Sequence, residues 1–292
     1  LPVPVISIMS KLFALFQYLL PQHLLSRFVG VFAERKFAKN ILIRLFIQKY
    51  RVDMSEAACD VADEYPNFNA FFTRKLKASA RPINSSPNII VSPADGRLVA
   101  SGRIKDSQLI QAKSRHFCTQ DLLGGDNTLA RTFDNGDFIT VYLSPRDYHR
   151  VHMPLNGRLL RTIYIPGRLF SVGNATSLHI PNLFARNERL VCVFETKAGL
   201  CCLILVGAMI VSSIETVWST EPFRNASKIN EVDYTLEKIP MTLEKGTEAG
   251  RFKLGSTVIV LFEASSVILD SNVIANQPIK MGESLGHIVK CE

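Results

Sequence analysis

The chain has 292 residues, of which 47% are apolar and 21% are charged. This composition excludes an intrinsically disordered protein, because there is enough apolar surface to offset the entropy lost on folding. With 16 glycines and 6 cysteines, it also excludes a collagen-like chain and a disulfide scaffold. The formal net charge of +8 indicates an anionic partner, and nucleic acid, acidic lipid and a phosphorylated metabolite all fit that description.

The basic excess is concentrated in the first 50 residues. Seven lysines and arginines stand there against the single acid Glu34, so this segment carries +6 of the +8. Apolar residues recur at helical spacing and predict short amphipathic helices over 7–20, 22–36 and 39–50, each with a basic opposite face. Such helices are typical of proteins that lie in the interface of an anionic membrane. An ordinary helical cap with a solvated basic face fits the pattern equally well.

A transmembrane span is not expected in this segment. A spanning helix needs about 20 mainly apolar residues, whereas Lys11, Gln17 and Pro21 interrupt the most apolar stretch. A cleaved signal peptide also fits poorly, because the apolar pattern continues past Pro21 without a small-residue cleavage site.

Beyond residue 50 the pattern changes from helical to β-rich. Residues 52–77 predict further helix, with Asn67 as an N-cap before an apolar face. From about residue 88, short alternating or β-branched runs recur between turn signals. The predicted strands are 97–101, 137–143, 157–165, 189–196, 201–206, 209–217, 256–263 and 266–270. The more polar segment 219–250 predicts a long surface loop.

Three short stretches contain residues able to do chemistry. Asp95 lies in the turn Val91–Gly96, Ser256 follows Gly255 at the start of an apolar run, and His149 and His152 lie three residues apart. Taken singly, each has a structural explanation: a turn acid, a strand-start serine and two satisfied histidines. The histidine spacing suits a metal ion, but no third ligand accompanies it, so no metal is expected.

Taken together, these residues suggest a charge-relay constellation. A serine nucleophile needs a base to accept its proton, and the base needs a carboxylate to fix its tautomer. Asp95, His152 and Ser256 supply the three residue types. No G-x-S-x-G motif surrounds Ser256, so an α/β-hydrolase nucleophile at this serine is not supported.

Motifs along nearly the whole chain make it similar to the bacterial type of phosphatidylserine decarboxylase proenzyme. They are FNAFFTRKL (68–76), VSPADGR (91–97), YLSPRDYHRVHMP (142–154), PNLFARNER (181–189), ILVGAMIVSSIETVW (204–218) and GRFKLGSTVIVLF (250–262). The histidine and LGST stretches are the most specific of these. The acidic C-terminal tail of longer family members is not represented.

The resemblance implies that the chain cuts itself between Gly255 and Ser256. His152, oriented by Asp95, would deprotonate Ser256, whose oxygen attacks the Gly255 carbonyl. An ester forms, β-elimination leaves dehydroalanine, and hydrolysis converts this to a pyruvoyl group. The products would be a β chain, 1–255, and an α chain, 256–292. Glycine at 255 suits such a step, because it leaves the carbonyl accessible.

The resemblance also implies the reaction of the mature enzyme. The pyruvoyl group derived from Ser256 would act as an electron sink and bind the amine of phosphatidylserine as a Schiff base. Loss of CO2 and protonation then give phosphatidylethanolamine. We assign the protonation, or assistance to decarboxylation, to His149, because imidazole titrates near neutral pH. Phe170 and Ser171 are candidates for lining the head-group pocket.

The expected architecture is α+β and β-rich, with a barrel-sandwich-like β core and N-terminal amphipathic helices. We divide the chain into a membrane-associating segment, 1–50, and a catalytic domain, 51–292. The expected partners are phosphatidylserine, an anionic membrane surface, the β and α chains of one precursor, and a second copy in a homodimer. The expected location is peripheral, on the cytoplasmic face of a bacterial cell membrane, because no Arg- and Ser-rich transit peptide precedes Lys11.

Other classes of function compete with this interpretation. A non-catalytic lipid-binding membrane protein of the same fold is the main alternative, and it would remain a single intact chain. A serine hydrolase is disfavoured, because maturation would consume Ser256. Nucleic-acid binding ranks last, since the basic residues accompany aliphatic helix faces without a recognised nucleic-acid-binding motif.

Overall fold

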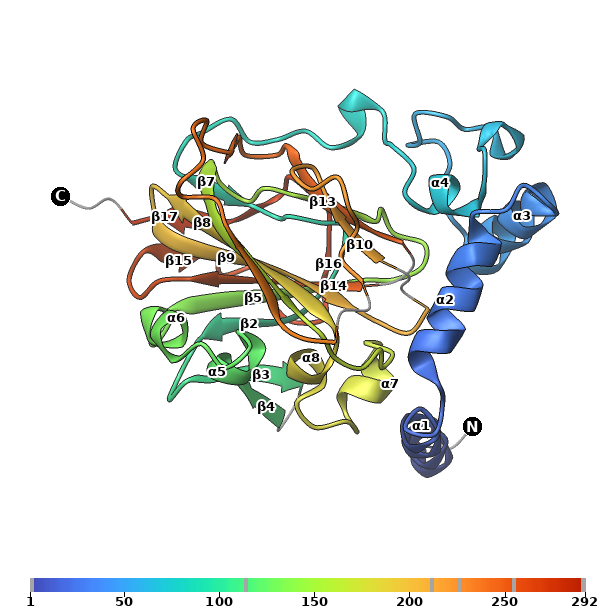
Figure 1. Ribbon diagram of the computed structural model, residues 1–292, viewed down its shortest axis with the longest axis horizontal. Helices are drawn as coiled ribbons and strands as arrows, with labels where there is room; N and C mark the ends of the chain where they lie inside the picture. Colours follow the sequence, from blue (N-terminus) through green and yellow to red (C-terminus); the bar gives the residue numbers. More distant parts are fainter. Residues whose placement is uncertain (1–2, 113–114, 211–212, 225–226, 254–255, 290–292) are drawn as a thin grey trace.

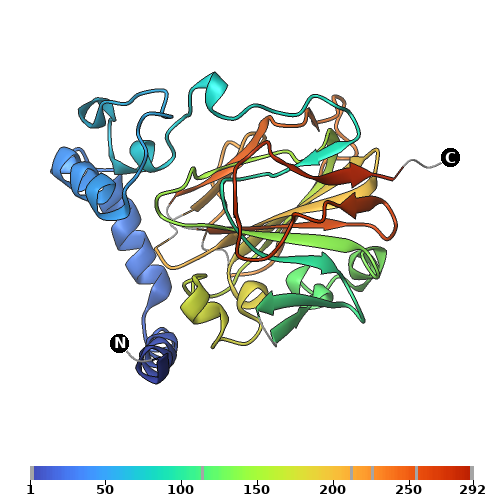
Figure 2. The same cartoon turned by 180° about the vertical axis from the view of Figure 1, so that it is seen from behind.

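The computed structural model describes residues 3–112, 115–210, 213–224, 227–253 and 256–289. The N-terminal helices α1 to α4 (within residues 3–72) gather at one side of a β body, and the C-terminal strands β15 (Val267–Leu269) and β17 (Ser284–Ile288) lie on the side away from them (Figures 1 and 2). The α-helices are α1 Val3–Phe16, α2 Gln22–Ala33, α3 Lys39–Tyr50, α4 Phe68–Phe72, α5 Thr119–Leu122, α6 Asn127–Thr132, α7 Asn174–Ser177 and α8 Leu183–Arg186; the 3₁₀ turns are η1 Ala62–Glu64 and η2 Ala78–Ala80.

Four sheets form the β body. The strands are β1 Ile89–Val91, β2 Gly96–Arg103, β3 Gln108–Ala112, β4 Arg115–Cys118, β5 Asp137–Leu143, β6 Arg150–His152, β7 Gly157–Ile165, β8 Arg189–Thr196, β9 Gly199–Gly207, β10 Ser213–Thr216, β11 Asn230–Asp233, β12 Thr242–Leu243, β13 Glu248–Lys253, β14 Ser256–Phe262, β15 Val267–Leu269, β16 Pro278–Ile279 and β17 Ser284–Ile288. The largest sheet has the order β11-β7-β8-β9-β14-β5-β2-β16, and β12 also pairs with β7. The smaller sheets are β1-β17-β15, β10-β13-β6 and β3-β4.

Strand β14 lies inside the largest sheet, antiparallel to both β5 and β9. All seven of its residues are buried. Val258 and Val260 pack into the core that contains residues of the sheets β1-β17-β15 and β10-β13-β6, whereas Ile259 and Leu261 pack into the core that contains residues of α5, α6 and α8. Burial on both faces explains why the sequence of β14 is a continuous apolar run instead of an alternating one.

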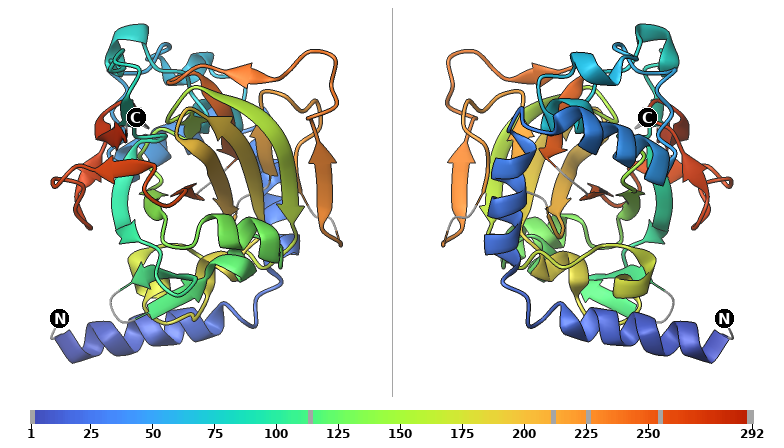
Figure 3. Two further views of the ribbon diagram at one scale, coloured as in Figure 1. Left: turned by 90° about the vertical axis from the view of Figure 1, so that its left-hand side faces the viewer. Right: turned by 90° about the vertical axis from the view of Figure 1, so that its right-hand side faces the viewer.

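A third cluster of buried apolar residues joins the helices at the side of the β body. Ile43 of α3 packs there with Phe71 and Phe72 of α4. The side chain of Asn67 accepts a hydrogen bond from the amide of Ala70, which confirms its predicted role as the N-cap of α4. Figure 3 shows α1 as a rod along the edge of the molecule, with α2 rising from its end toward α3.

The β-rich α+β architecture expected from the sequence is confirmed. Strands β5, β7 and β8 have the predicted bounds, and α3 coincides with the predicted helix 39–50. The predicted surface loop 219–250 is wrong in part, because β11 and β12 add to the edge of the largest sheet through β7. Each residue of β11 is exposed, and the strand has a mainly polar sequence. The strand is therefore held by main-chain hydrogen bonds to β7, and it shows no apolar periodicity from which it could be predicted.

Candidate active site

Ser256 is the first residue of β14, where it faces Leu143 on β5 and Gly207 on β9. The residue is fully buried, and its hydroxyl oxygen has no hydrogen-bond partner among the described residues. Buried hydroxyl groups are normally paired, because leaving one unpaired costs about 1–3 kcal/mol. An unpaired serine oxygen at the end of a central strand is therefore available for chemistry.

A cavity of about 210 Å3 lies beside Ser256. Its walls are largely apolar and come from segments far apart in the sequence: Phe13 of α1, Phe46 and Tyr50 of α3, Phe72 of α4, and Tyr142, Leu143, Pro145, Ser171, Val172, Ala208, Met209 and Ile210 of the β body. The sequence predicted Ser171 but not the aromatic residues, which only the tertiary fold brings to Ser256. Gly255, the other residue of the predicted cleavage site, lies outside the described residues.

His149 is fully buried near this cavity. Its ring lies flat on the ring of Phe72, with centroids 4.0 Å apart and planes 23° from parallel. The atom Nε2 is 3.1 Å from the carbonyl oxygen of Ser144, which can only accept a hydrogen bond, so Nε2 carries the proton. Burial, helped by the positive charge of Arg74, lowers the pKa of His149 to about 3. His149 is therefore neutral, and its Nδ1 has no partner in the described part of the chain.

His152 has both ring nitrogens engaged. Nδ1 donates to the carbonyl oxygen of Gly246 at 2.8 Å, which leaves Nε2 to accept from the hydroxyl of Tyr148 at 3.0 Å. Burial lowers the pKa of His152, and the hydrogen bond to the carbonyl of Gly246 only partly opposes this effect. In the pairing of β6 with β13, His152 stands opposite Glu248.

His149 lies closer along β13 to Ser256 than His152 does. Its carbonyl accepts from the amide of Phe252, four residues further along β13 than Glu248. Its ring also binds Ser144, the residue after the Leu143 that faces Ser256. Both observations place His149 near the end of β13 that leads to Ser256.

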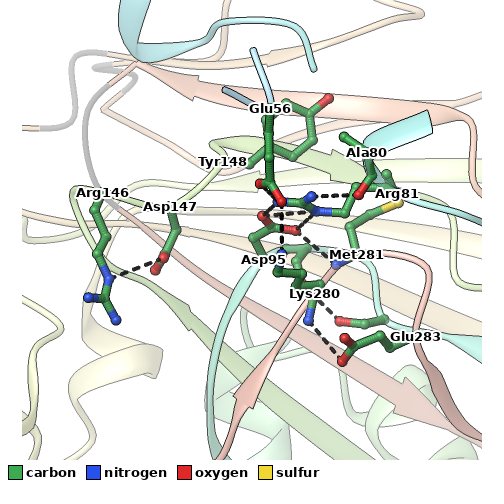
Figure 4. Close-up of polar contacts among 12 residues, drawn as sticks. Glu56, Ala80, Arg81, Asp95, Arg146, Asp147, Tyr148, Lys280, Met281 and Glu283 are labelled. Carbon is green, nitrogen blue, oxygen red and sulfur yellow. Dashed lines mark hydrogen bonds and ion pairs between the residues drawn. The ribbon is translucent and has the colours of Figure 1, made fainter. Parts of the chain in front are cut away.

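Asp95 is held by an arginine. Its carboxylate accepts from Nε of Arg81 at 2.9 Å and 3.2 Å, from Nη2 of the same residue at 2.5 Å, and from the amide of Met281 at 2.9 Å (Figure 4). Glu56 binds the same guanidinium at 2.7 Å and also pairs with Lys280. The side chains of Arg81 and Lys280 lower the pKa of Glu56 to about 2 despite its partial burial.

This network joins the chain on both sides of the predicted cut. Glu56, Arg81 and Asp95 precede Ser256, whereas Lys280 and Met281 follow it. The turn that carries Asp95 also contacts His152 through the main chain, because the amide of His152 donates to the carbonyl of Pro93 at 2.7 Å. Arg81 was not singled out in the sequence, since a lone arginine before a proline carries no recognisable signal.

Of the two residues predicted to line the head-group pocket, Ser171 lines the cavity and Phe170 does not. Ser171 lines the cavity with Ser256, and its amide donates to Gln17. The buried ring of Phe170 packs 4.9 Å from the ring of Tyr18, under the guanidinium of Arg186. Phe170 is thus packed among neighbouring side chains, and the lining of the cavity passes through Ser171 and Val172.

A second, larger hollow of about 580 Å3 lies between α2 and the strands β10 and β13. Three cationic side chains line it: Arg27 of α2, Lys253 at the end of β13, and Arg224. Lys253 pairs with Glu34 and Glu215 at 2.9 Å each, while Arg27 and Arg224 are exposed. This hollow, called the basic groove below, can receive an anion close in the chain to Ser256.

Among the described helices, none combines the length and the apolar character needed to cross a bilayer.

Comparison with known proteins shows the family of this chain. The family model described as phosphatidylserine decarboxylase matches residues 68–287, and a second model, described as PSD, matches residues 12–51. A protein of Pseudomonas fluorescens strain Pf-5 named phosphatidylserine decarboxylase proenzyme is 50% identical over 95% of this chain and 97% of its own length. Proteins with the same name from Alcanivorax borkumensis strain SK2 (50% identical, 96% of this chain and 97% of the relative) and Ectopseudomonas mendocina strain ymp (51%, 95% and 98%) are equally similar. The resemblance found in the sequence is therefore confirmed, and the chain belongs to the phosphatidylserine decarboxylase family of carboxy-lyases.

Proposed function

We propose that this protein decarboxylates phosphatidylserine to phosphatidylethanolamine and CO2, with a pyruvoyl group that it makes from its own Ser256. The observation that carries the proposal is the unpaired, buried oxygen of Ser256 at the wall of an apolar cavity. Relatives about 50% identical over nearly the whole chain are named as proenzymes of this activity, which supports the same reaction here.

Maturation breaks the bond between Gly255 and Ser256. The oxygen of Ser256 attacks the carbonyl carbon of Gly255, the C–N bond breaks, and an ester replaces the amide. Loss of the Cα proton of residue 256 then breaks its Cβ–Oγ bond, which leaves a carboxylate on Gly255 and dehydroalanine at position 256. Water displaces the nitrogen as ammonia and leaves the pyruvoyl group. The β chain, 1–255, and the α chain, 256–292, stay together because β14 pairs with strands of the β chain on both edges.

The surroundings of Ser256 fit a pyruvoyl group. The group is small and uncharged, and position 256 has an apolar cavity on one side and no hydrogen-bond partner for its present oxygen among the described residues. A pyruvoyl carbonyl supplies an electron sink for the amine of the substrate. The aromatic wall of Phe46, Tyr50 and Phe72 keeps water from the reacting atoms, which strengthens electrostatic interactions inside the cavity.

The two histidines divide the remaining work in this proposal. From the resemblance, His152 with Asp95 serves maturation and His149 serves decarboxylation. The neutral His149 holds its proton on Nε2 and leaves Nδ1 free to accept one, so at neutral pH it suits a base better than an acid. Its position on the Ser256 side of β13 favours a part in maturation as well. Replacement of each histidine by alanine separates these roles: if His149→Ala blocks self-cleavage and His152→Ala does not, the division is reversed.

Two places are candidates for binding the anionic head group. We propose that Ser171 contacts the serine moiety at the cavity, whereas Arg27 and Arg224 of the basic groove attract the phosphate. Phe170 supports this wall from behind, through its contact with Tyr18. Charged groups of this kind orient a phosphate without taking part in bond breaking.

We propose that residues 1–50 place the enzyme on an anionic membrane and that residues 51–292 form the catalytic domain. Large apolar side chains on α1 and α2 are exposed: Leu12, Phe13, Leu15, Phe16, Leu24, Phe28, Val31 and Phe32. The +6 charge of the same segment adds electrostatic attraction to acidic lipid. The proposed location is peripheral, on the cytoplasmic face of a bacterial membrane. A homodimer of processed units is proposed from the family resemblance, and sedimentation of the purified enzyme in detergent tests it.

Maturation and activity are tested on the purified full chain. A denaturing gel is expected to show two chains, and mass spectrometry to find a pyruvoyl group at the start of the small one. Phosphatidylserine in mixed micelles should lose CO2 with the wild-type enzyme and not with Ser256→Ala. A single intact chain that binds lipid, under conditions in which a processed relative matures, would instead favour the non-catalytic lipid-binding protein.

Membrane association is tested with vesicles of neutral lipid and of neutral lipid mixed with phosphatidylglycerol. Binding should be stronger to the anionic vesicles and should weaken with salt, because screening reduces the attraction. Phe28→Asp should weaken binding to both. Binding that ignores both lipid charge and salt would remove the electrostatic part of the proposal.

A further inference from the structure

The end of α4 and the loop that carries His149 bind each other at three points. The ring of Phe72 stacks on His149. Nη2 of Arg74 donates to the carbonyl oxygens of Arg146 at 3.0 Å and Asp147 at 3.4 Å. In return, Nε of Arg150 donates to the carbonyl oxygen of Thr73 at 2.9 Å. Each segment thus contributes an arginine that donates to the main chain of the other. His149 directly precedes one of these arginines, Arg150, and its ring packs against Phe72.

The loop needs such support because it is not part of a strand. Residues 144–149 follow β5 and precede β6 without regular structure. A local turn shapes part of the loop, since the amide and hydroxyl of Ser144 donate to the carboxylate of Asp147 at 2.7 Å and 2.6 Å. That turn gives the loop its form but does not fix its place against α4. The contacts of Arg74 and Arg150 do so.

Arg74 is an unexpected residue to find at this point. Its side chain is 4% exposed, yet Nε and Nη1 have no hydrogen-bond partner among the residues that the structure describes. Arg150, by contrast, also pairs with Glu248 at 2.6 Å. Burying an incompletely paired guanidinium is unfavourable, and an apolar residue of similar volume is often no less stable. Stability alone therefore does not explain an arginine at position 74.

We propose that Arg74 is a positioning residue for the reaction: with Arg150, it clamps loop 144–150 to α4 and so holds the imidazole of His149 in one orientation beside the Ser256 cavity. The proposal rests on the catalytic role given to His149 above. An arginine suits this task because the Nη2 group of its planar guanidinium carries two N–H donors, which here meet two successive carbonyl groups. Loss of the clamp leaves every group of the site present, but His149 is free to turn away.

The charge of Arg74 provides a second signature. It acts with burial to lower the pKa of His149. Removing the charge therefore raises the pKa of His149, and the rate should begin to fall with decreasing pH at a higher pH than in the wild type. Arg74→Met removes the charge and the two hydrogen bonds, whereas Arg74→Lys keeps the charge without the planar guanidinium. A shift of the acidic limb in Arg74→Met that is absent in Arg74→Lys therefore reports the charge.

The experiment compares Arg74→Met, Arg74→Lys, His149→Ala and the control Arg131→Met, which replaces an exposed arginine on α6 that does not line the cavity. Decarboxylation of phosphatidylserine in mixed micelles is followed against pH. We expect Arg74→Met to lower kcat roughly tenfold or more with KM little changed, and to shift the acidic limb to higher pH. Arg74→Lys should recover part of kcat and leave the acidic limb of the pH profile where it is in the wild type. If Arg74→Met does not fold, Arg74→Lys is the variant that tests the clamp.

A readout without the pyruvoyl group uses the uncleaved Ser256→Ala chain labelled with 15N-histidine. The ring nitrogens of His149 should report one tautomer, with the proton on Nε2, and Arg74→Met in this background should average the two tautomers. Unchanged ring signals together with wild-type kcat in Arg74→Met would overturn the clamp while leaving the proposed function intact. Full activity of His149→Ala would instead overturn the role of His149 on which the clamp depends.

Discussion

The imidazole of His149 lies flat on the ring of Phe72, with the ring centroids 4.0 Å apart. One residue comes from the helices at the side of the molecule and the other from a loop of the β body, so the site is complete only when both parts are packed together. The helices therefore contribute to the proposed reaction site, in addition to the membrane contact proposed for α1 and α2. Phe72 has two tasks there, because it also lines the cavity beside Ser256.

Truncating Phe72 should separate its packing from its contact with His149. Phe72→Ala is expected to destabilise the fold by about 3–5 kcal/mol, as for other buried phenylalanines, and Phe72→Leu by less. Both should slow decarboxylation, because His149 loses the flat surface that orients it. Phe117→Leu is the matched control, since Phe117 is equally buried and does not line the cavity. Equal activity of Phe72→Leu and Phe117→Leu would contradict the role given to the stacking contact.

Ser256→Ala should abolish self-cleavage without loss of stability. The substitution removes the attacking oxygen, so a denaturing gel should show one chain of full length. Because that oxygen is buried and unpaired among the described residues, its removal eliminates an unfavourable buried group. The thermal midpoint of this variant should therefore not fall below that of an uncleaved reference such as His152→Ala. A clear drop in the midpoint would mean that the hydroxyl makes a stabilising contact.

Stability should decrease as the pH falls below about 6.5. The pKa of His149 is about 3 in the folded protein against 6.5 for an ordinary histidine, so between these values the unfolded chain binds a proton that the folded chain does not. Burial lowers the pKa of His152 in the same direction. Urea unfolding of Ser256→Ala at about pH 7.5 and about pH 5 measures the difference. His149→Gln in the same background should show a weaker dependence, and an unchanged one would place the titration elsewhere.

The basic groove should govern substrate binding and not the chemical step. Replacing Arg27 or Arg224 with glutamine removes a charged hydrogen-bond donor for the phosphate, which is expected to raise KM for phosphatidylserine about tenfold and to leave kcat unchanged. Arg131→Gln is the control for a general loss of charge. Kinetics in mixed micelles of fixed lipid fraction test this prediction. A fall in kcat at constant KM would contradict the proposal that the basic groove binds the phosphate.

Much of the fold could be predicted from the sequence. The predicted relay of Asp95, His152 and Ser256 is not connected by side-chain hydrogen bonds among the described residues, because Asp95 binds Arg81 and the ring of His152 binds Tyr148 and Gly246. Strands such as β5 and β14 are continuous apolar runs because they are buried on both faces, and that requirement is visible in the residues themselves. The chemistry proposed for Ser256, His149 and His152 was inferred from the sequence alone, because serine and imidazole groups in distinctive motifs would carry it. The exposed strand β11 escaped prediction because main-chain pairing to β7, and not side-chain burial, holds it in place.

The partners of these residues were decided by the tertiary structure alone. Sequence motifs could name Asp95 but not Arg81 or the amide of Met281, which bind its carboxylate from 14 and 186 residues away. They could name His149 but not the ring of Phe72 or the guanidinium of Arg74, which set its orientation and help to lower its pKa. The physical reason is that reactivity belongs to single side chains, whereas orientation, burial and electrostatic environment arise only when distant segments pack together.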